Sequence, residues 1–159
     1  SELPLQLDFI GEGPLRSELK ERIIALQLQD RVSLLGLKSP AEVASFMRQS
    51  RCLLLPSRVA SDGDSEGCPV VVLEAQLAGL PVVSTFHAGI PEVVVDGSTG
   101  FLAQEGDVVN LADGLERLLL NSDLAGRMGE AAAAHARSQF TIEEHLRSVA
   151  NVLRDSATS

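Results

Sequence analysis

Short, mostly apolar segments alternate along the chain with segments whose apolar residues recur at helical spacing. The first kind is typical of buried β-strands and the second of amphipathic helices. Glycine and proline close several of the apolar segments, as expected at the ends of strands and helices. The pattern predicts strands over residues 5–10, 31–35, 52–55, 81–85 and 100–103, and helices over residues 15–28, 39–49, 69–78, 107–120, 122–138 and 141–154.

Strands that are almost wholly apolar and alternate with helices favour the α/β class. They predict one parallel sheet with helices on both faces. Sheets of this kind bind ligands at the carboxyl ends of their strands, in loops that lead to helix N-termini. The loops after Ile10, Leu35, Leu55 and Thr85 are therefore the candidate ligand-binding loops.

Length and charge narrow the classes of partner. The chain has 159 residues, with 13 Lys and Arg against 22 Asp and Glu and a formal charge of −9. This length is enough for one compact domain with a buried core. Binding to nucleic acid or to an anionic membrane face requires clustered basic residues, so the charge argues against both as the main partner. The two cysteines, Cys52 and Cys68, lack metal-ligand spacing and suit a reducing cytoplasm.

The loop after the third predicted strand carries most of the chemical information. Glu66 lies in the loop and Glu74 lies inside the following helix, with Gly67 and Pro69 between them. Glycine allows close approach of a ligand, and the first amides of a helix are unsatisfied donors suited to a diphosphate or a sugar hydroxyl. A carboxylate accepts two hydrogen bonds side by side, so Glu74 can hold adjacent ribose hydroxyls while Glu66 holds another sugar. The alternative is that both are solvated acids. The apolar neighbours of Glu74 predict a half-buried carboxylate, which favours a ligand.

Two adjoining stretches carry a family resemblance: SEGCPVVVLEAQLAGLPVVST and HAGIPEVVVDGSTGFL. They resemble the carboxy-terminal nucleotide-sugar domain of retaining GT-B glycosyltransferases of family 4, also called glycosyl transferases group 1. The family pattern is Glu-x7-Glu, a small-residue turn, Pro-Val-Val, and a Gly-rich loop that ends in Pro-Glu. The resemblance extends over nearly the whole chain and is closest to enzymes of exopolysaccharide synthesis, such as those of colanic acid or amylovoran-type polymers. It implies a Rossmann-like fold.

The resemblance also implies roles for individual residues. Glu66 corresponds to the glutamate at the donor-sugar hydroxyls and is the expected catalytic residue, and Glu74 corresponds to the ribose-binding glutamate. Gly36 and Leu37 fall where the nucleobase is usually placed. The segment whose backbone faces the donor sugar and phosphates consists of Gly67, Cys68, Pro69 and Val70.

The implied enzyme is a retaining hexosyltransferase that uses a nucleotide-diphosphate sugar and needs neither metal nor cofactor. Its expected partners are that donor, a glycan or lipid-linked acceptor, and an amino-terminal domain outside residues 1–159. The family's first strand of this domain, with the Arg and Lys that follow it, has no counterpart here, and Ser1 stands where a Met would begin a chain. We therefore expect a truncated domain that lacks its central strand, is inactive and poorly stable alone, and comes from a cytoplasmic enzyme. Association with the inner membrane face would depend on the missing half.

Four further residues are candidates for the cleft, each with a plain alternative. Gly11 and Gly13 can line it, although a turn that requires positive φ explains them equally well. They also begin like a dinucleotide-binding fingerprint, but Arg16 replaces the third small residue. Arg58 can meet a phosphate or an acidic acceptor, or pair with a nearby Asp. His87 lies at the ligand end of the sheet, with no partner acid evident in the sequence.

Two other functions remain open. A GT-B epimerase or phosphorylase would use the same donor cleft, and its reaction products would distinguish it from a transferase. A non-catalytic sugar-nucleotide sensor would lack the second α/β domain and the Arg and Lys phosphate loop.

Overall fold

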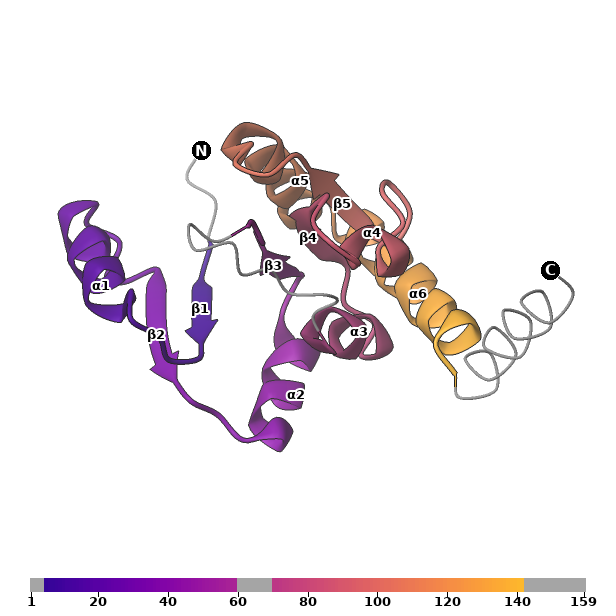
Figure 1. Cartoon of the computed structure of the whole chain (residues 1–159), viewed down its shortest axis with the longest axis horizontal. Coiled ribbons are helices and arrows are strands. Elements are labelled where there is room, and N and C mark those ends of the chain that lie inside the picture. The colour runs from indigo at the N-terminus through magenta and orange to yellow at the C-terminus, as the bar shows by residue number, and fades with distance from the viewer. Residues whose placement is uncertain (1–4, 60–69, 142–159) are drawn as a thin grey trace, which may run out of the picture. The chain divides into compact units, whose positions relative to one another are not determined.

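The computed structural model describes residues 5–59 and 70–141 (Figure 1). The chain divides into two compact units, unit 1 up to Gln49 and unit 2 from Ser50 onward, and each is described by itself. Unit 1 contains β1 (Leu7–Ile10), α1 (Arg16–Ala25), β2 (Val32–Gly36) and α2 (Pro40–Gln49). Unit 2 contains β3 (Leu53–Leu55), α3 (Val70–Leu77), β4 (Val82–Thr85), α4 (Ile90–Val93), β5 (Gly100–Ala103), α5 (Val108–Leu120) and α6 (Ser122–Gln139).

Unit 1 is built on a parallel pair of strands. Residues of β1 pair with β2 from Leu7 opposite Val32 to Ile10 opposite Gly36, with a shift in register just before Ile10. The Gly11 amide continues the ladder by donating to the Gly36 carbonyl at 2.9 Å. The carboxyl ends of both strands therefore meet at one edge, as the sequence predicts.

The start of α2 follows from its local sequence. The Ser39 hydroxyl donates to the Glu42 carboxylate at 2.7 Å, and the Ser39 amide donates to the same carboxylate at 2.9 Å. The Glu42 amide lies 3.4 Å from the Ser39 hydroxyl, which completes a capping box. The hydrogen bond from the Ser39 amide is the main cause that lowers the pKa of Glu42.

Unit 2 contains a three-stranded parallel sheet in the order β3-β4-β5. One face carries Val83 and Ala103, which form a buried core with residues of α5 and α6: Leu111, Leu118, Ala125 and Met128. The opposite face carries Val82 and Ser84, which are also fully buried. α3 contacts both β3 and β4. Burial on both faces explains why these strands are mostly apolar.

The structure confirms the α/β class and the parallel pairing but differs from the expectations in three respects. The described strands form two sheets rather than one. The first helix is shorter than expected, because Leu15 and Leu26 are exposed and do not extend its buried face. The one-turn helix α4 was not predicted, since four residues are too few to show a helical period. The helix expected at 141–154 lies outside the described residues, apart from Thr141.

Close backbone packing joins α6 to the turn after α3. A Cβ atom added at Gly129 would overlap the carbonyl oxygen of Gly79. Gly79 has a φ of +78° and begins the connection to β4. Gly126, one turn earlier on α6, is exposed and has no heavy atom within 4 Å of an added Cβ. The two glycines of α6 thus stand in opposite environments.

We expect Gly129→Ala to lower the free energy of unfolding by about 1–3 kcal/mol, because the methyl group would force the backbones apart. Gly126→Ala is the matched control and should raise it by up to about 1 kcal/mol through helix propensity alone. Urea unfolding of both variants, made in the whole protein, measures the difference. Equal effects of the two substitutions would contradict the packing argument.

Candidate functional site

The carboxyl ends of β3, β4 and β5 lie at one edge of the sheet in unit 2, because the three strands are parallel. Three connecting segments therefore start from this edge. They begin at Pro56 after β3, at Phe86 after β4 and at Gln104 after β5. This is the edge at which the sequence places the ligand.

A single carboxylate joins the three segments. One oxygen of Glu105, Oε1, lies 2.7 Å from Nδ1 of His87, and the other, Oε2, accepts the Val59 amide hydrogen at 3.1 Å. The His87 side chain is 3% exposed and that of Glu105 is 35% exposed. The hydrogen bond from His87, followed by that from Val59, lowers the pKa of Glu105 below its ordinary value. Glu105 is the partner acid that the sequence did not reveal, since it lies 18 residues away from His87.

Two buried hydroxyls hold the backbone after β3. Ser84 donates to the carbonyl of Leu55, and Thr85 donates to the carbonyl of Ser57, each at 2.5 Å. Both side chains are almost fully buried, so each hydroxyl needs such a partner. β4 therefore sets the path of the backbone as it leaves β3.

The segment after β4 is tightly turned. The His87 amide donates to the carbonyl of Thr85, and the His87 carbonyl accepts from the amide of Ile90 at the start of α4. Ala88 has a φ of +44°, a left-handed conformation that costs a non-glycine residue roughly 1–2 kcal/mol. Local strain of this kind concentrates at functional sites.

α3 presents its carboxylate to solvent. Val72, Ala75 and Gln76 form its buried face, whereas Glu74 is exposed. The prediction of a half-buried Glu74 is therefore wrong: the helix places it on the side away from Val72 and Gln76, so its apolar neighbours in sequence are not its neighbours in space. The exposed carboxylate is accessible to a ligand. Val70, the first residue of α3, is also exposed.

A buried amide links α3 to the segment after β4. Gln76 donates through Nε2 to the Val93 carbonyl at 3.0 Å and to the Thr99 hydroxyl at 3.1 Å. The Thr99 hydroxyl also accepts the Val95 amide hydrogen. These contacts fix the end of α4 against the helix that carries Glu74.

Several predicted site residues fall outside the described part of the chain: Glu66, Gly67, Cys68 and Pro69. Arg58 is described and is exposed. Its suggested Asp partners also lie outside the described residues.

In unit 1, four predicted residues lie at the carboxyl edge of β1 and β2. Gly11 and Gly36 have φ values of +133° and +69°, so the turn geometry accounts for both glycines. Gly13 has no heavy atom within 4 Å of an added Cβ. Leu37 is 78% exposed, so its side chain is free to contact a planar ligand.

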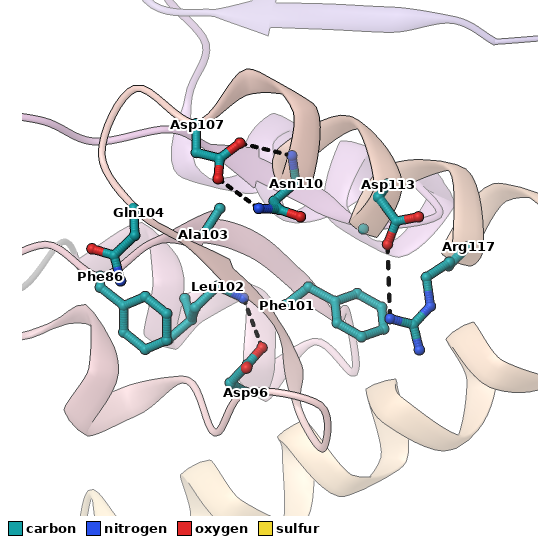
Figure 2. A pocket seen from close by; sticks show the side chains of 11 residues that line it. Phe86, Asp96, Phe101, Leu102, Ala103, Gln104, Asp107, Asn110, Asp113 and Arg117 are labelled. Atoms are coloured by element: carbon teal, nitrogen blue, oxygen red, sulfur yellow. Dashed lines mark hydrogen bonds and ion pairs between the residues drawn. The ribbon is translucent and has the colours of Figure 1, made fainter.

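A separate groove of about 320 Å³ runs along β5 and α5 in unit 2 (Figure 2). It is lined by three acids, and each already has a partner within the protein. Asp96 accepts the Leu102 amide hydrogen, Asp107 caps α5 at Asn110, and Asp113 lies 3.9 Å from Arg117. Three carboxylates beside one guanidinium would repel a diphosphate, so this groove does not suit a nucleotide-sugar.

Other chemistries find little support in the described residues. No group of three or more His, Cys, Asp or Glu side chains in residues 5–59 and 70–141 is arranged to hold a metal ion. Burial raises the pKa of the Cys52 thiol to about 11, which makes it a poor nucleophile. Within the same residues, no helix has both the length and the apolar character to cross a membrane.

The fold and the clustered loops define an α/β, Rossmann-like domain of the GT-B glycosyltransferase type. The chain is similar to the structure of Anabaena HepE in complex with UDP-glucose, with a TM-score of 0.77 and 25% sequence identity. The superposed region covers 94% of this chain and 41% of the HepE chain. The C-terminal domain of a group 1 glycosyl transferase from Francisella tularensis shares the fold, with a TM-score of 0.70 over 80% of this chain and 63% of that one.

The chain belongs to the glycosyl transferases group 1 family, whose model matches residues 1–135. It is 40% identical over 147 residues to the amylovoran biosynthesis glycosyltransferase AmsK of Erwinia amylovora. This alignment covers 91% of this chain and 36% of AmsK. It is 42% identical over 107 residues to the putative colanic acid biosynthesis glycosyltransferase WcaL of Escherichia coli, covering 67% of this chain and 26% of WcaL. The matched region thus spans about a third of the length of AmsK and about a quarter of that of WcaL. The family resemblance is confirmed, and AmsK and WcaL are relatives of the exopolysaccharide type that the sequence predicts.

The lowered pKa of Glu105 predicts a defined pH dependence of stability. A carboxylate whose pKa is lower in the folded than in the unfolded state stabilises the fold at pH values above the pKa of the unfolded state. This stabilisation disappears as the pH falls through the pKa of the folded state. We expect Glu105→Gln to be less stable than wild type near pH 7, with the difference shrinking as the pH falls below about 4.5, the ordinary value for Glu. Urea unfolding of the whole protein between pH 7 and pH 3.5 measures this. Glu116→Gln, at an exposed position of α5, controls for the loss of one negative charge. A difference for Glu105→Gln that does not vary with pH would contradict the assignment.

Proposed function

We propose that this chain is the donor-binding part of a retaining hexosyltransferase that uses a nucleotide-diphosphate sugar in polysaccharide biosynthesis. The observation that carries the proposal is the identity to AmsK, which extends over 91% of this chain. The HepE complex with UDP-glucose supports a nucleotide-sugar as the donor. The acceptor we propose is a glycan or a lipid-linked saccharide.

In the proposed site, Glu74 binds the ribose of the donor. Its carboxylate is exposed on α3, and two oxygens side by side suit the two adjacent hydroxyls of a ribose. The first amides of α3, at Val70 and Val71, have no partner within the helix and face the end at which the helix dipole is positive. They would stabilise the diphosphate, whose negative charge grows as the glycosidic bond breaks.

Glu66 and the segment from Gly67 to Val70 are assigned to the donor sugar by their match to the family motif. Gly36 and Leu37 are assigned to the nucleobase in the same way. Arg58 and His87 are assigned to the cleft as neighbours of the donor or acceptor. No metal ion or cofactor takes part in the proposed reaction.

The remaining proposals concern the whole protein. We propose an amino-terminal α/β domain that binds the acceptor, together with a central strand and an Arg and Lys phosphate loop supplied from outside residues 1–159. The whole enzyme would act in the cytoplasm, with any attachment to the inner membrane face made through that other domain. The chain by itself would not transfer sugar.

We expect Glu74→Ala in the whole protein to raise the KM for the donor by a factor of about 10 or more, because a ribose-binding contact is lost in both the ground state and the transition state. Glu66→Ala should mainly lower kcat, because it removes a contact at the reacting sugar. Steady-state kinetics with a panel of nucleotide-sugars, including UDP-glucose, and product analysis by NMR test both. Glu130→Ala, on the exposed side of α6, is the control.

Donor kinetics that stay unchanged in both variants would refute the site. Product analysis also decides the reaction type: a retained anomeric configuration in a glycoside supports the transferase, whereas epimerised or phosphorolysed donor contradicts it.

A further inference from the structure

We propose that Glu105 is a positioning residue for donor binding: through His87 and the Val59 amide, it fixes the start of the loop that follows β3. This inference rests on the proposed function, because it assigns to Glu105 the preparation of the same donor site. Glu105 itself need not touch the donor.

The geometry gives Glu105 two partners from two different connections. Its Oε1 lies 2.7 Å from His87 Nδ1, in the segment after β4, and its Oε2 accepts from the Val59 amide at 3.1 Å, in the segment after β3. Glu105 itself follows β5. One side chain therefore joins the carboxyl ends of all three strands in unit 2. The His87 ring is 3% exposed, so it is held in one orientation by packing as well as by the hydrogen bond.

The connection after β3 is long. Residues 56–69 separate β3 from α3, which is more than in most connections from a strand to a helix. Thr85 holds the carbonyl of Ser57, and Glu105 holds the amide of Val59. Together they fix the backbone direction just before the part of the sequence that contains Glu66. Order that exists before binding does not have to be supplied by the donor.

A carboxylate suits this task better than an amide. Both of its partners donate: the Val59 amide always, and Nδ1 of His87 when it carries a proton. A glutamine offers one acceptor and one donor, so it satisfies both partners only if His87 moves its proton to Nε2. Glu105→Gln therefore preserves the size of the side chain while forcing either a lost contact or the other histidine tautomer.

The test uses Glu105→Gln and Glu105→Ala in the whole protein, with Glu116→Gln as the matched control. Donor and acceptor kinetics are measured with the donor that the wild type turns over fastest in the panel of nucleotide-sugars used above, at a temperature well below every variant's Tm. We expect donor kcat/KM to fall on the order of 10- to 100-fold in Glu105→Ala, mainly through the donor KM, because both contacts are lost and small displacements of positioning groups have effects of this size. The fall in Glu105→Gln should be smaller, because the other histidine tautomer lets glutamine keep both partners. The acceptor KM of the Glu105 variants and all kinetic constants of Glu116→Gln should stay at wild-type values.

NMR of ¹⁵N-labelled histidine should show the proton of His87 on Nδ1 in wild type and on Nε2 in Glu105→Gln.

Two outcomes overturn the inference. One is an unchanged donor KM in both Glu105 variants. The other is a fall in activity that matches the loss of folded protein and affects donor and acceptor equally, which is what a purely structural contact would give. Glu74→Ala distinguishes this failure from failure of the proposed function. If Glu74→Ala raises the donor KM and the Glu105 variants do not, only the role of Glu105 is wrong; if neither changes it, the donor site itself is wrong.

Discussion

Parallel pairing of β3, β4 and β5 is the constraint from which the rest of unit 2 follows. Parallel strands must be connected by segments that cross the sheet, so both faces become covered and the strands become mostly apolar. The same pairing brings the carboxyl ends of all three strands to one edge. Residues far apart in sequence, such as Val59, His87 and Glu105, can therefore meet there.

Burial at that edge then determines the polar contacts. Ser84, Thr85 and His87 are nearly inaccessible to water, and a buried polar group without a partner is costly. The hydroxyls bond to backbone carbonyls after β3, and the imidazole bonds to Glu105. A rigid sheet thereby sets the paths of loops that would otherwise have many conformations. Such a scaffold would suit the proposed donor site, because positioning and electrostatic stabilisation both require groups that are held in fixed places.

Most of the fold was predictable because its determinants are local. The strand at 100–103 and the helix at 107–120 agree with β5 and α5 within a residue, since an apolar run and an N-terminal Asp cap are visible in the sequence. The capping box of Ser39 and Glu42 is likewise a short-range pattern. Much less of the candidate site was predictable. The local pattern placed Glu74 correctly on a helix, but its exposure depends on which face of α3 the sheet covers.

The sequence by itself determined the fold class, the order of strands and helices, and the family, because hydrophobic period, caps and a contiguous motif depend only on residues close along the chain. The tertiary structure alone decided that His87 is buried against Glu105, that Gly129 must lack a side chain beside Gly79, and that the described strands divide between two sheets. Each of these depends on the register of distant segments. No local pattern encodes that register, since it arises only when the strands pair and their side chains compete for the same buried space.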